Sequence, residues 1–356
     1  MIILSNLVNY VKKNKDKDYK EYPFNEIDAS IYACLSYIDL TSIYEKNITI
    51  KNIYEKLQNR FILKNKQKFN EENKLLLKEM STSKRYKDNY ITDYKKVINK
   101  DTQFGAITIV VPKHFKLIAF EGTEDDLVGW EENFKMSYMY PIPAHKKALK
   151  YLKENIKPLD YVVYIAGHSK GGNLAMAAAM ELNFLKRYQI DYIFNFDGPG
   201  FLNDLVNFKK YQKIEKKIIN YYPSESIVGM IFKSLGRKKI IKSTQFKVFQ
   251  HNIHTWVIEN NSFKEDKLSN YSQKLHHKLD MIVKRYEKEE LKRFISTFFY
   301  ILNTAGYLYK SDLKKLSLEK LKKLLIETRS LNDEERKLLF DVFKSLIENE
   351  NMKNYQ

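Results

Sequence analysis

The middle of the chain alternates short apolar runs with amphipathic segments. The amphipathic segments His145–Asn155 and Gly171–Leu185 are expected to be helices, and Pro112-Lys113 is expected to turn the first two apolar runs into a strand pair. The apolar runs are rich in β-branched and aromatic residues and have the length of buried strands: Gly105–Val111, Phe115–Phe120, Tyr161–Ala166, Tyr192–Phe196, Ile218–Tyr222 and Phe246–Gln250. Strands that alternate with helices in this way are typical of an α/β fold with a mostly parallel sheet and crossover helices.

The two ends of the chain have a different pattern. In the N-terminal part, Asp28–Tyr37 has a helix cap followed by apolar residues at helical spacing. The C-terminal part repeats leucines at helical intervals: Leu313, Leu316, Leu318, Leu321, Leu324, Leu325, Leu338, Leu339 and Leu346. The sequence therefore predicts an N-terminal helical segment over residues 1–100 that packs on the core, an α/β core over 101–264, and a C-terminal helical region over 265–356 as a candidate lid or cap.

The composition is that of a folded protein with a basic surface. A chain with 44% hydrophobic and 14% aromatic residues has enough core material to fold. The net charge of +18 suggests an attraction to polyanions, but the lysines are spread along the chain and alternate with acidic residues, as in Lys264–Lys267. We therefore expect a solvated basic surface, with a weak attraction to anionic membranes and no specific nucleic-acid partner. No oligomeric state is predicted.

A single cysteine, Cys34, excludes an internal disulfide framework and favours a reducing compartment. Because Cys34 lies in an apolar run, we expect it to be a buried structural thiol. The apolar start Met1–Leu4 is followed by lysines, an order that does not fit a secretory signal, and Phe294–Leu308 is too short and too interrupted to span a bilayer. The expected location is the cytoplasm.

The strongest chemical signal is Gly167-His168-Ser169-Lys170-Gly171, which lies between an expected strand and an Ala-rich expected helix. A sharp strand-to-helix turn strains the serine backbone and requires small flanking residues, so that strand and helix can approach each other. The serine then lies at a helix N-terminus, where free N–H groups favour a developing oxyanion. The pattern predicts that Ser169 is a nucleophile, with the backbone N–H of Lys170 as one oxyanion donor. The turn after Leu117–Phe120 offers the second donor at Thr123.

Together, these motifs resemble class 3 lipases of the α/β-hydrolase superfamily and, more closely, an uncharacterised bacterial branch called Mbeg-like. The resemblance covers residues 24 to 258. It is carried by Phe24–Asp28, Leu35–Tyr37, Ala119–Thr123, Gly129–Phe134, Gly167–Gly172, Asp197–Phe201, Ser226–Met230 and Gln250-His251. Two positions depart from it: Glu121 stands where class 3 lipases carry Arg, and Asn252 stands where the Mbeg-like branch often has an acidic residue.

The base and the acid should follow the nucleophile along the chain. His251 follows an expected strand and matches the Gln-His pair of the resembling branch, and His254 is the alternative base. Glu225 matches the position of the class 3 lipase acid and is the preferred acid. Asp197, at the end of the strand Tyr192–Phe196, is the alternative acid.

The resemblance implies a serine hydrolase that cleaves a carboxylic ester, with a lipid or acylglycerol as the substrate class, and the aromatic segments Met136–Tyr140 and Phe294–Tyr309 are candidate linings of an acyl pocket. A non-catalytic relative that binds lipid membrane or nucleic acid through its basic surface is the alternative, and an amidase or thioesterase is a third. The spacing of Ser81 and Lys84 fits a β-lactamase-type motif but lacks the companion motifs. No cofactor and no metal site are predicted.

Overall fold

An eight-stranded sheet forms the centre of the fold in the computed structural model, which describes residues 6–58, 68–124, 126–158, 160, 162–307 and 318–347. The predictions for Met1–Leu4, Tyr309, Leu313 and Leu316 lie outside the described residues. The strands are adjacent in chain order: β1 (Ile48–Thr49), β2 (Tyr90–Asn99), β3 (Thr102–Val111), β4 (Phe115–Phe120), β5 (Val162–His168), β6 (Ile190–Phe196), β7 (Ile218–Pro223) and β8 (Arg237–Ile241).

Strands β4 to β8 are parallel, and β1 to β4 are antiparallel. This is the mostly parallel α/β fold that the sequence predicts. The boundary expected between residues 100 and 101 falls in the turn that joins β2 to β3, and both strands belong to the central sheet. The charged residues of β2 gave it no clear alternation, so it was missed among the expected helices.

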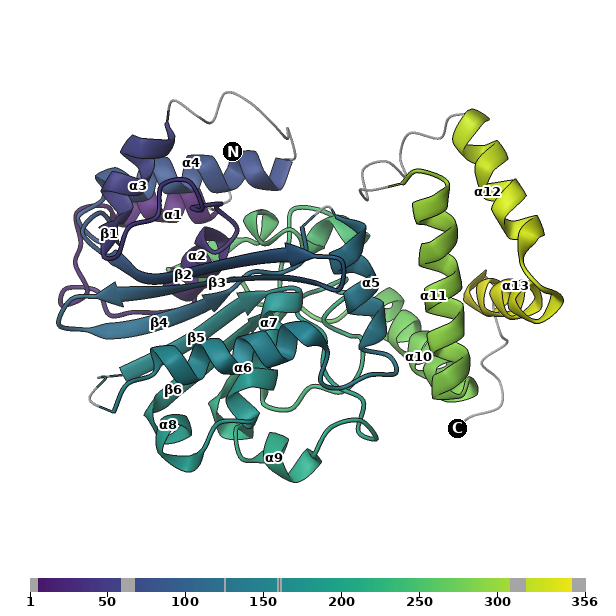
Figure 1. The fold of residues 1–356 in the computed structure, drawn as a ribbon. Coiled ribbons are helices and arrows are strands. Elements are labelled where there is room, and N and C mark those ends of the chain that lie inside the picture. The colour runs from purple at the N-terminus through teal and green to yellow at the C-terminus, as the bar shows by residue number, and fades with distance from the viewer. Residues whose placement is uncertain are drawn as a thin grey trace.

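Helices cover both faces of the sheet (Figure 1). The side chains of the strands divide between two hydrophobic cores, one on each face. In β5, Val163 and Ile165 pack in one core, while Tyr164 and Ala166 pack in the other, as the period of two along a strand requires. The first core contains α6 (Pro143–Asn155) and α7 (Lys170–Met180), with α8 (Phe184–Gln189) and α9 (Phe208–Gln212) at its border. The second contains α1 (Leu7–Asn14), α2 (Glu26–Leu35), α3 (Ile50–Leu57) and α4 (Lys68–Thr82).

A buried ion pair joins the N-terminal helices. The Arg85 guanidinium bonds both carboxylate oxygens of Asp28 at 2.8 and 2.5 Å, and both side chains are fully buried. Asn25 caps α2 in a capping box with Asp28. Cys34 is buried on α2, as expected, and burial raises the pKa of its thiol.

The C-terminal helices pack beside α5 (Leu127–Lys135), next to the carboxyl ends of the parallel strands (Figure 1). They are α10 (Asn270–Arg285), α11 (Lys288–Thr304), α12 (Leu318–Ser330) and α13 (Asp333–Ile347). The Phe134 ring of α5 meets the Phe299 ring of α11 edge to face at 5.6 Å, and Ser269 N–H donates to the Ser224 carbonyl at the start of α10. In the described part of the chain, no helix combines the length and apolarity needed to cross a membrane.

The strand expected at Phe246–Gln250 is wrong. This segment forms the short 3-10 helix η2 (Lys247–His251), and the last strand of the sheet is β8. An apolar run alone does not identify a strand, and here Phe246, Val248 and Phe249 are exposed. The remaining elements are η1 (Glu215–Lys217), η3 (Ile253–Thr255) and the ribbon of β9 (Ile258–Glu259) and β10 (Ser262–Phe263).

Candidate active site

Ser169 occupies a strained turn between β5 and α7. Its backbone has a φ of 57° and a ψ of −132°, a left-handed conformation that costs a non-glycine residue about 1–3 kcal/mol. The turn is held in place because Ser169 N–H donates to the Phe196 carbonyl at 2.9 Å. The side chain is half-buried. The turn therefore presents a hydroxyl at the N-terminus of a helix.

The flanking glycines allow this turn by their lack of a side chain. A Cβ on Gly167 would lie 2.1 Å from the carbonyl carbon of Gly171, and a Cβ on Gly171 would lie 2.1 Å from the Phe120 carbonyl oxygen. Either side chain would push the strand and the helix apart. The Gly-x-Ser-x-Gly spacing thus has a steric cause in this fold.

His251 and Asp197 are joined by a short hydrogen bond. His251 Nδ1 lies 2.6 Å from Asp197 Oδ2, the Asp197 side chain is fully buried, and that of His251 is 25% exposed. Asp197 follows β6 directly with a φ of 50°, and its other oxygen accepts from Ser226 Oγ and from Gly229 N–H. Because a carboxylate only accepts hydrogen bonds, His251 carries its proton on Nδ1, and Nε2 is left as a base.

Glu225, the acid preferred from the sequence, is bonded elsewhere. Its Oε2 accepts from Lys247 N–H at 2.7 Å and from Gln250 Nε2 at 3.0 Å. Among the described residues, the carboxylate on the His251 ring is that of Asp197. The structure thus places the alternative acid, Asp197, on the His251 ring, whereas the carboxylate of the preferred acid, Glu225, holds the segment that precedes His251.

The alternative base, His254, is buried on η3 and bonds Asn73 Oδ1 of α4 at 2.7 Å. Burial lowers the pKa of its imidazole to about 3. A neutral ring with this partner stabilises the contact between η3 and α4. His251 is the histidine that the fold brings to the end of β5.

His168 connects the serine turn to the segment that carries His251. Its Nε2 lies 2.7 Å from the His251 carbonyl, and its Nδ1 lies 3.0 Å from the Tyr37 hydroxyl. Burial lowers the pKa of His168 well below its usual value, so the neutral ring donates through Nε2 and accepts from Tyr37. Within the described residues no hydrogen bond joins Ser169 Oγ to His251, whose ring centroid lies 4.7 Å from that of His168. Catalytic hydrogen bonds are often long before substrate binds.

Both segments that are expected to carry the oxyanion donors lie beside Ser169. Lys170 is the first residue of α7, so its N–H has no acceptor within the helix. A Cβ on Gly122 would lie 3.1 Å from the Ser169 Cβ, which places the turn after β4 against the serine. The next residue, Thr123, is held through its hydroxyl by the Asn133 side-chain amide of α5.

A buried ion pair that the sequence did not reveal locks α7 to α5. Lys170 Nζ lies 3.0 Å from Glu132 Oε2, both side chains are fully buried, and Nζ also donates to the Gln103 carbonyl. The Glu132 carboxylate accepts three further bonds, from Thr102 Oγ1, Gln103 N–H and Ala144 N–H. The segment Gly129–Phe134 thus holds the Lys170 and Thr123 segments in place through adjacent residues, Glu132 and Asn133.

Glu121, which stands where class 3 lipases carry Arg, faces strand β2. Burial raises the pKa of its carboxyl group, and Lys96 Nζ donates to Oε1 at 3.1 Å while also pairing with Glu124. Gly105 provides the space, because a Cβ there would lie 1.8 Å from Glu121 Oε2. The turn before Thr123 is therefore anchored to β2 by a lysine.

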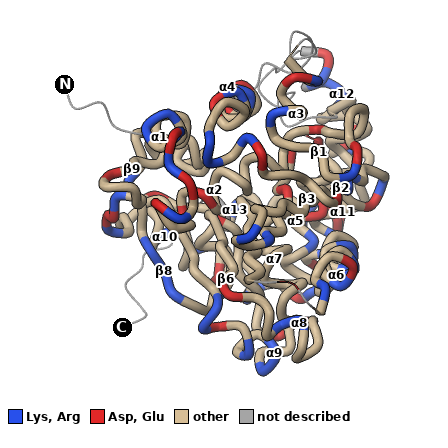
Figure 2. The backbone as a smooth tube through the Cα atoms, turned by 90° about the vertical axis from the view of Figure 1, so that its left-hand side faces the viewer, with Lys and Arg blue, Asp and Glu red and all other residues tan. Residues whose placement is uncertain are grey.

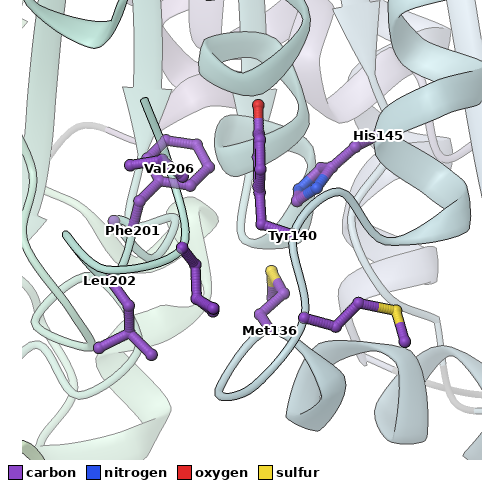
Figure 3. A pocket seen from close by; sticks show the side chains of 9 residues that line it. Met136, Tyr140, His145, Phe201, Leu202 and Val206 are labelled. Atoms are coloured by element: carbon purple, nitrogen blue, oxygen red, sulfur yellow. The ribbon is translucent and has the colours of Figure 1, made fainter. Parts of the chain in front are cut away.

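A small apolar pocket lies behind the first turn of α7. Figure 3 shows Met136, Tyr140 and His145 on one side and Phe201, Leu202 and Val206 on the other. Asn173, one turn after Ser169, joins the two walls: its Nδ2 donates to the Pro199 and Gly200 carbonyls, and its Oδ1 lies 2.6 Å from His145 Nε2. Met136–Tyr140, one of the two segments expected to line an acyl pocket, contributes to this wall.

His145 makes stability depend on pH. Burial lowers the pKa of its imidazole to about 4, whereas the unfolded value is about 6.5. As the pH falls, the imidazole is protonated in the unfolded chain before it is protonated in the folded protein. The unfolding free energy therefore falls between pH 6.5 and pH 4, by about 3 kcal/mol for this group. We expect His145→Gln, which keeps an amide donor toward Asn173, to flatten the decline in unfolding free energy between these pH values, as measured by urea titration. If the unfolding free energies of the wild type and His145→Gln declined equally with pH, His145 would not be the group responsible.

Among the described residues, no three His, Cys, Asp or Glu side chains gather as a metal site requires.

Comparison with known proteins gives a family and a structural neighbour. The model of the Mbeg1-like family matches residues 80–300, more than half of the 356-residue chain. None of the curated proteins matches the sequence. Among solved structures, the chain is similar to the crystal structure of M37 lipase, with 15% identity over 70% of this chain and 83% of that chain, at a TM-score of 0.37.

Proposed function

The chain belongs to the Mbeg1-like family, and we propose that it is a serine hydrolase that cleaves a carboxylic ester through Ser169, His251 and Asp197. The observation that carries the proposal is the 2.6 Å bond between His251 Nδ1 and a buried Asp197, at the strand end next to the Ser169 turn. A base oriented by a carboxylate beside a strained serine is the arrangement that acyl transfer requires.

In the proposed reaction, His251 Nε2 accepts the proton of Ser169 Oγ as the oxygen attacks the ester carbonyl carbon. The Asp197 carboxylate stabilises the imidazolium that forms, and the backbone N–H groups of Lys170 and Thr123 bind the carbonyl oxygen as it becomes negative. A single such donor is worth about 3–4 kcal/mol of transition-state stabilisation. The imidazolium returns its proton to the leaving alcohol, and water then releases the acid from the acyl-enzyme with His251 as base again.

The apolar pocket beside Asn173 has an accessible volume of about 10 Å³, which is room for one water and too little for an acyl chain. Its methionines Met136 and Met139 are flexible side chains that adapt to apolar ligands of different shape. The substrate class therefore rests on the resemblance to class 3 lipases. We therefore place the substrate among lipid or acylglycerol esters.

Hydrolysis of p-nitrophenyl butyrate and decanoate tests the proposal. We expect measurable turnover by the wild type and none above background for Ser169→Ala and His251→Ala, because each removes a group that transfers the proton or forms the acyl-enzyme. His277→Ala, a change at an exposed histidine of α10, is the matched control and should keep full activity. A folded wild type without turnover of either ester would favour the non-catalytic alternative.

Tyr37→Phe tests how the site is held together. The Tyr37 hydroxyl bonds His168 Nδ1, and His168 in turn donates to the His251 carbonyl. Loss of this bond should free the ring of His168 and lower kcat about fivefold with little change in KM, since one buried hydrogen bond is worth about 1 kcal/mol.

Tyr32→Phe is the control for Tyr37→Phe, because the Tyr32 hydroxyl is equally buried but bonds Tyr19 and Asn89, away from the site. If both variants lose the same fraction of kcat, Tyr37 has a general structural role and no specific positioning role.

A further inference from the structure

The chain next to His251 is basic over a long stretch. Residues 226–258 contain no Asp or Glu and six cationic residues: Lys233, Arg237, Lys238, Lys239, Lys242 and Lys247. Five of the cationic side chains are exposed: Lys233, Arg237, Lys238, Lys242 and Lys247. Elsewhere Lys and Arg are interleaved with acidic residues, and Figure 2 shows β8 as a stretch of Lys and Arg at the edge of the molecule. This asymmetry gives one side of the site a positive potential.

Apolar side chains protrude from the same stretch. Phe246 is 61% exposed, Val248 55% and Phe249 56%, and all three lie within the five residues before His251. Tyr271 of α10 is also exposed, and Lys247 Nζ lies 5.8 Å from the centroid of its ring. We call Phe246, Lys247, Val248, Phe249 and Tyr271 the η2 surface. A cluster of exposed apolar and aromatic side chains is more often an interaction site than a part of the surface without function.

The η2 surface is held in shape from beneath. Gln250 is buried, its Oε1 accepts from Glu225 N–H, and its Nε2 donates to Glu225 Oε2. The same carboxylate oxygen accepts from Lys247 N–H. Because these bonds fix the backbone, Phe246, Val248 and Phe249 are presented to solvent by a defined structure.

A second exposed apolar group, on α8, lacks these properties. Phe184, Leu185 and Tyr188 are at least 68% exposed, but the neighbouring cations are occupied by the protein itself. Lys186 Nζ donates to the Lys153 and Ile156 carbonyls, and Arg187 donates to the Leu182 carbonyl. Moreover, α8 directly precedes β6, at the amino ends of the parallel strands and away from Ser169 (Figure 1).

We propose that the η2 surface docks on the surface of an anionic lipid bilayer. Phe246, Val248 and Phe249 enter the interface between head groups and acyl chains, while the exposed cations bind anionic head groups. This inference rests on the proposed function, since docking brings the His251 side of the site to a lipid ester.

Flotation with vesicles tests the inference without catalysis. The protein is the Ser169→Ala variant, mixed with vesicles of phosphatidylcholine alone or of equimolar phosphatidylcholine and phosphatidylglycerol. We expect binding to the mixed vesicles, little binding to phosphatidylcholine, and a loss of about tenfold or more in partitioning for the added pair Phe246→Ser and Phe249→Ser. The matched pair Phe184→Ser and Tyr188→Ser on α8 should leave partitioning unchanged.

Any other result of the vesicle-binding experiment overturns the inference. Unchanged binding by the η2 pair, or loss of binding by the α8 pair, would move the membrane contact elsewhere. Absence of vesicle binding together with retention of a single-stranded RNA homopolymer, lost in Lys242→Glu with Lys247→Glu, would assign the basic stretch to nucleic acid. Vesicle binding by a protein whose wild type hydrolyses no ester would leave the docking surface intact and refute the proposed function alone.

Discussion

Asp197→Asn is expected to lower kcat for ester hydrolysis by about 10⁴-fold. The amide that replaces the carboxylate can donate to His251 Nδ1, which leaves the proton on Nε2 and removes the base that faces Ser169. The amide also carries no charge to stabilise the imidazolium. The fold should survive, because the amide oxygen can still accept from Ser226 Oγ and Gly229 N–H, the two donors to Asp197 Oδ1. Steady-state kinetics with p-nitrophenyl butyrate measures the effect.

Glu225→Gln is the matched control for Asp197→Asn. Glu225 bonds the backbone of Lys247 and the side chain of Gln250 but not the His251 ring. A glutamine keeps an acceptor there, so we expect a change in kcat of less than about tenfold, in line with one altered hydrogen bond. The reverse order of effects would return the acid to Glu225.

The second large effect concerns stability. Glu132→Ala leaves the Lys170 ammonium buried with only the Gln103 carbonyl as a partner, and it removes the acceptor for Thr102 Oγ1, Gln103 N–H and Ala144 N–H. Breaking a buried pair by removing one partner costs about 3–5 kcal/mol of unfolding free energy. Urea denaturation followed by circular dichroism should show this loss.

Removing both charges distinguishes the cost of an unpaired charge from the cost of lost packing. Glu132→Leu combined with Lys170→Met retains apolar volume and leaves no buried charge, so it should recover part of the stability that Glu132→Ala loses. A double variant less stable than Glu132→Ala would show that the unpaired Lys170 ammonium is not the main cause of the lost unfolding free energy. It would also show that the attraction within the pair exceeds the cost of desolvating its two charges.

The fold and the serine turn follow from local signals in the sequence. The apolar strand before Ser169, the glycines beside it and the Ala-rich helix after it are consecutive, and each has a local physical cause. His251 is the residue that chain order and the resemblance both indicate. These features required no knowledge of which strands are neighbours.

The choice between Asp197 and Glu225 depended on the order of strands in the sheet. Strand β6 pairs directly with β5, so the end of β6 at Asp197 lies next to the serine turn, whereas Glu225 follows β7, one strand farther away. Both residues follow apolar runs, and the sequence does not show which run pairs with β5. The long-range contacts of Tyr37 with His168 and of Lys170 with Glu132 were missed for the same reason.

The central claim is that Ser169 is the nucleophile, and a covalent adduct tests it most directly. The folded wild type is treated with a fluorophosphonate, digested and mapped by mass spectrometry, with Ser169→Ala and His251→Ala treated in parallel. We expect one phosphonylated peptide, modified at Ser169, and no adduct in either variant. A folded wild type that remains unlabelled, or that is labelled at another residue, would contradict the claim.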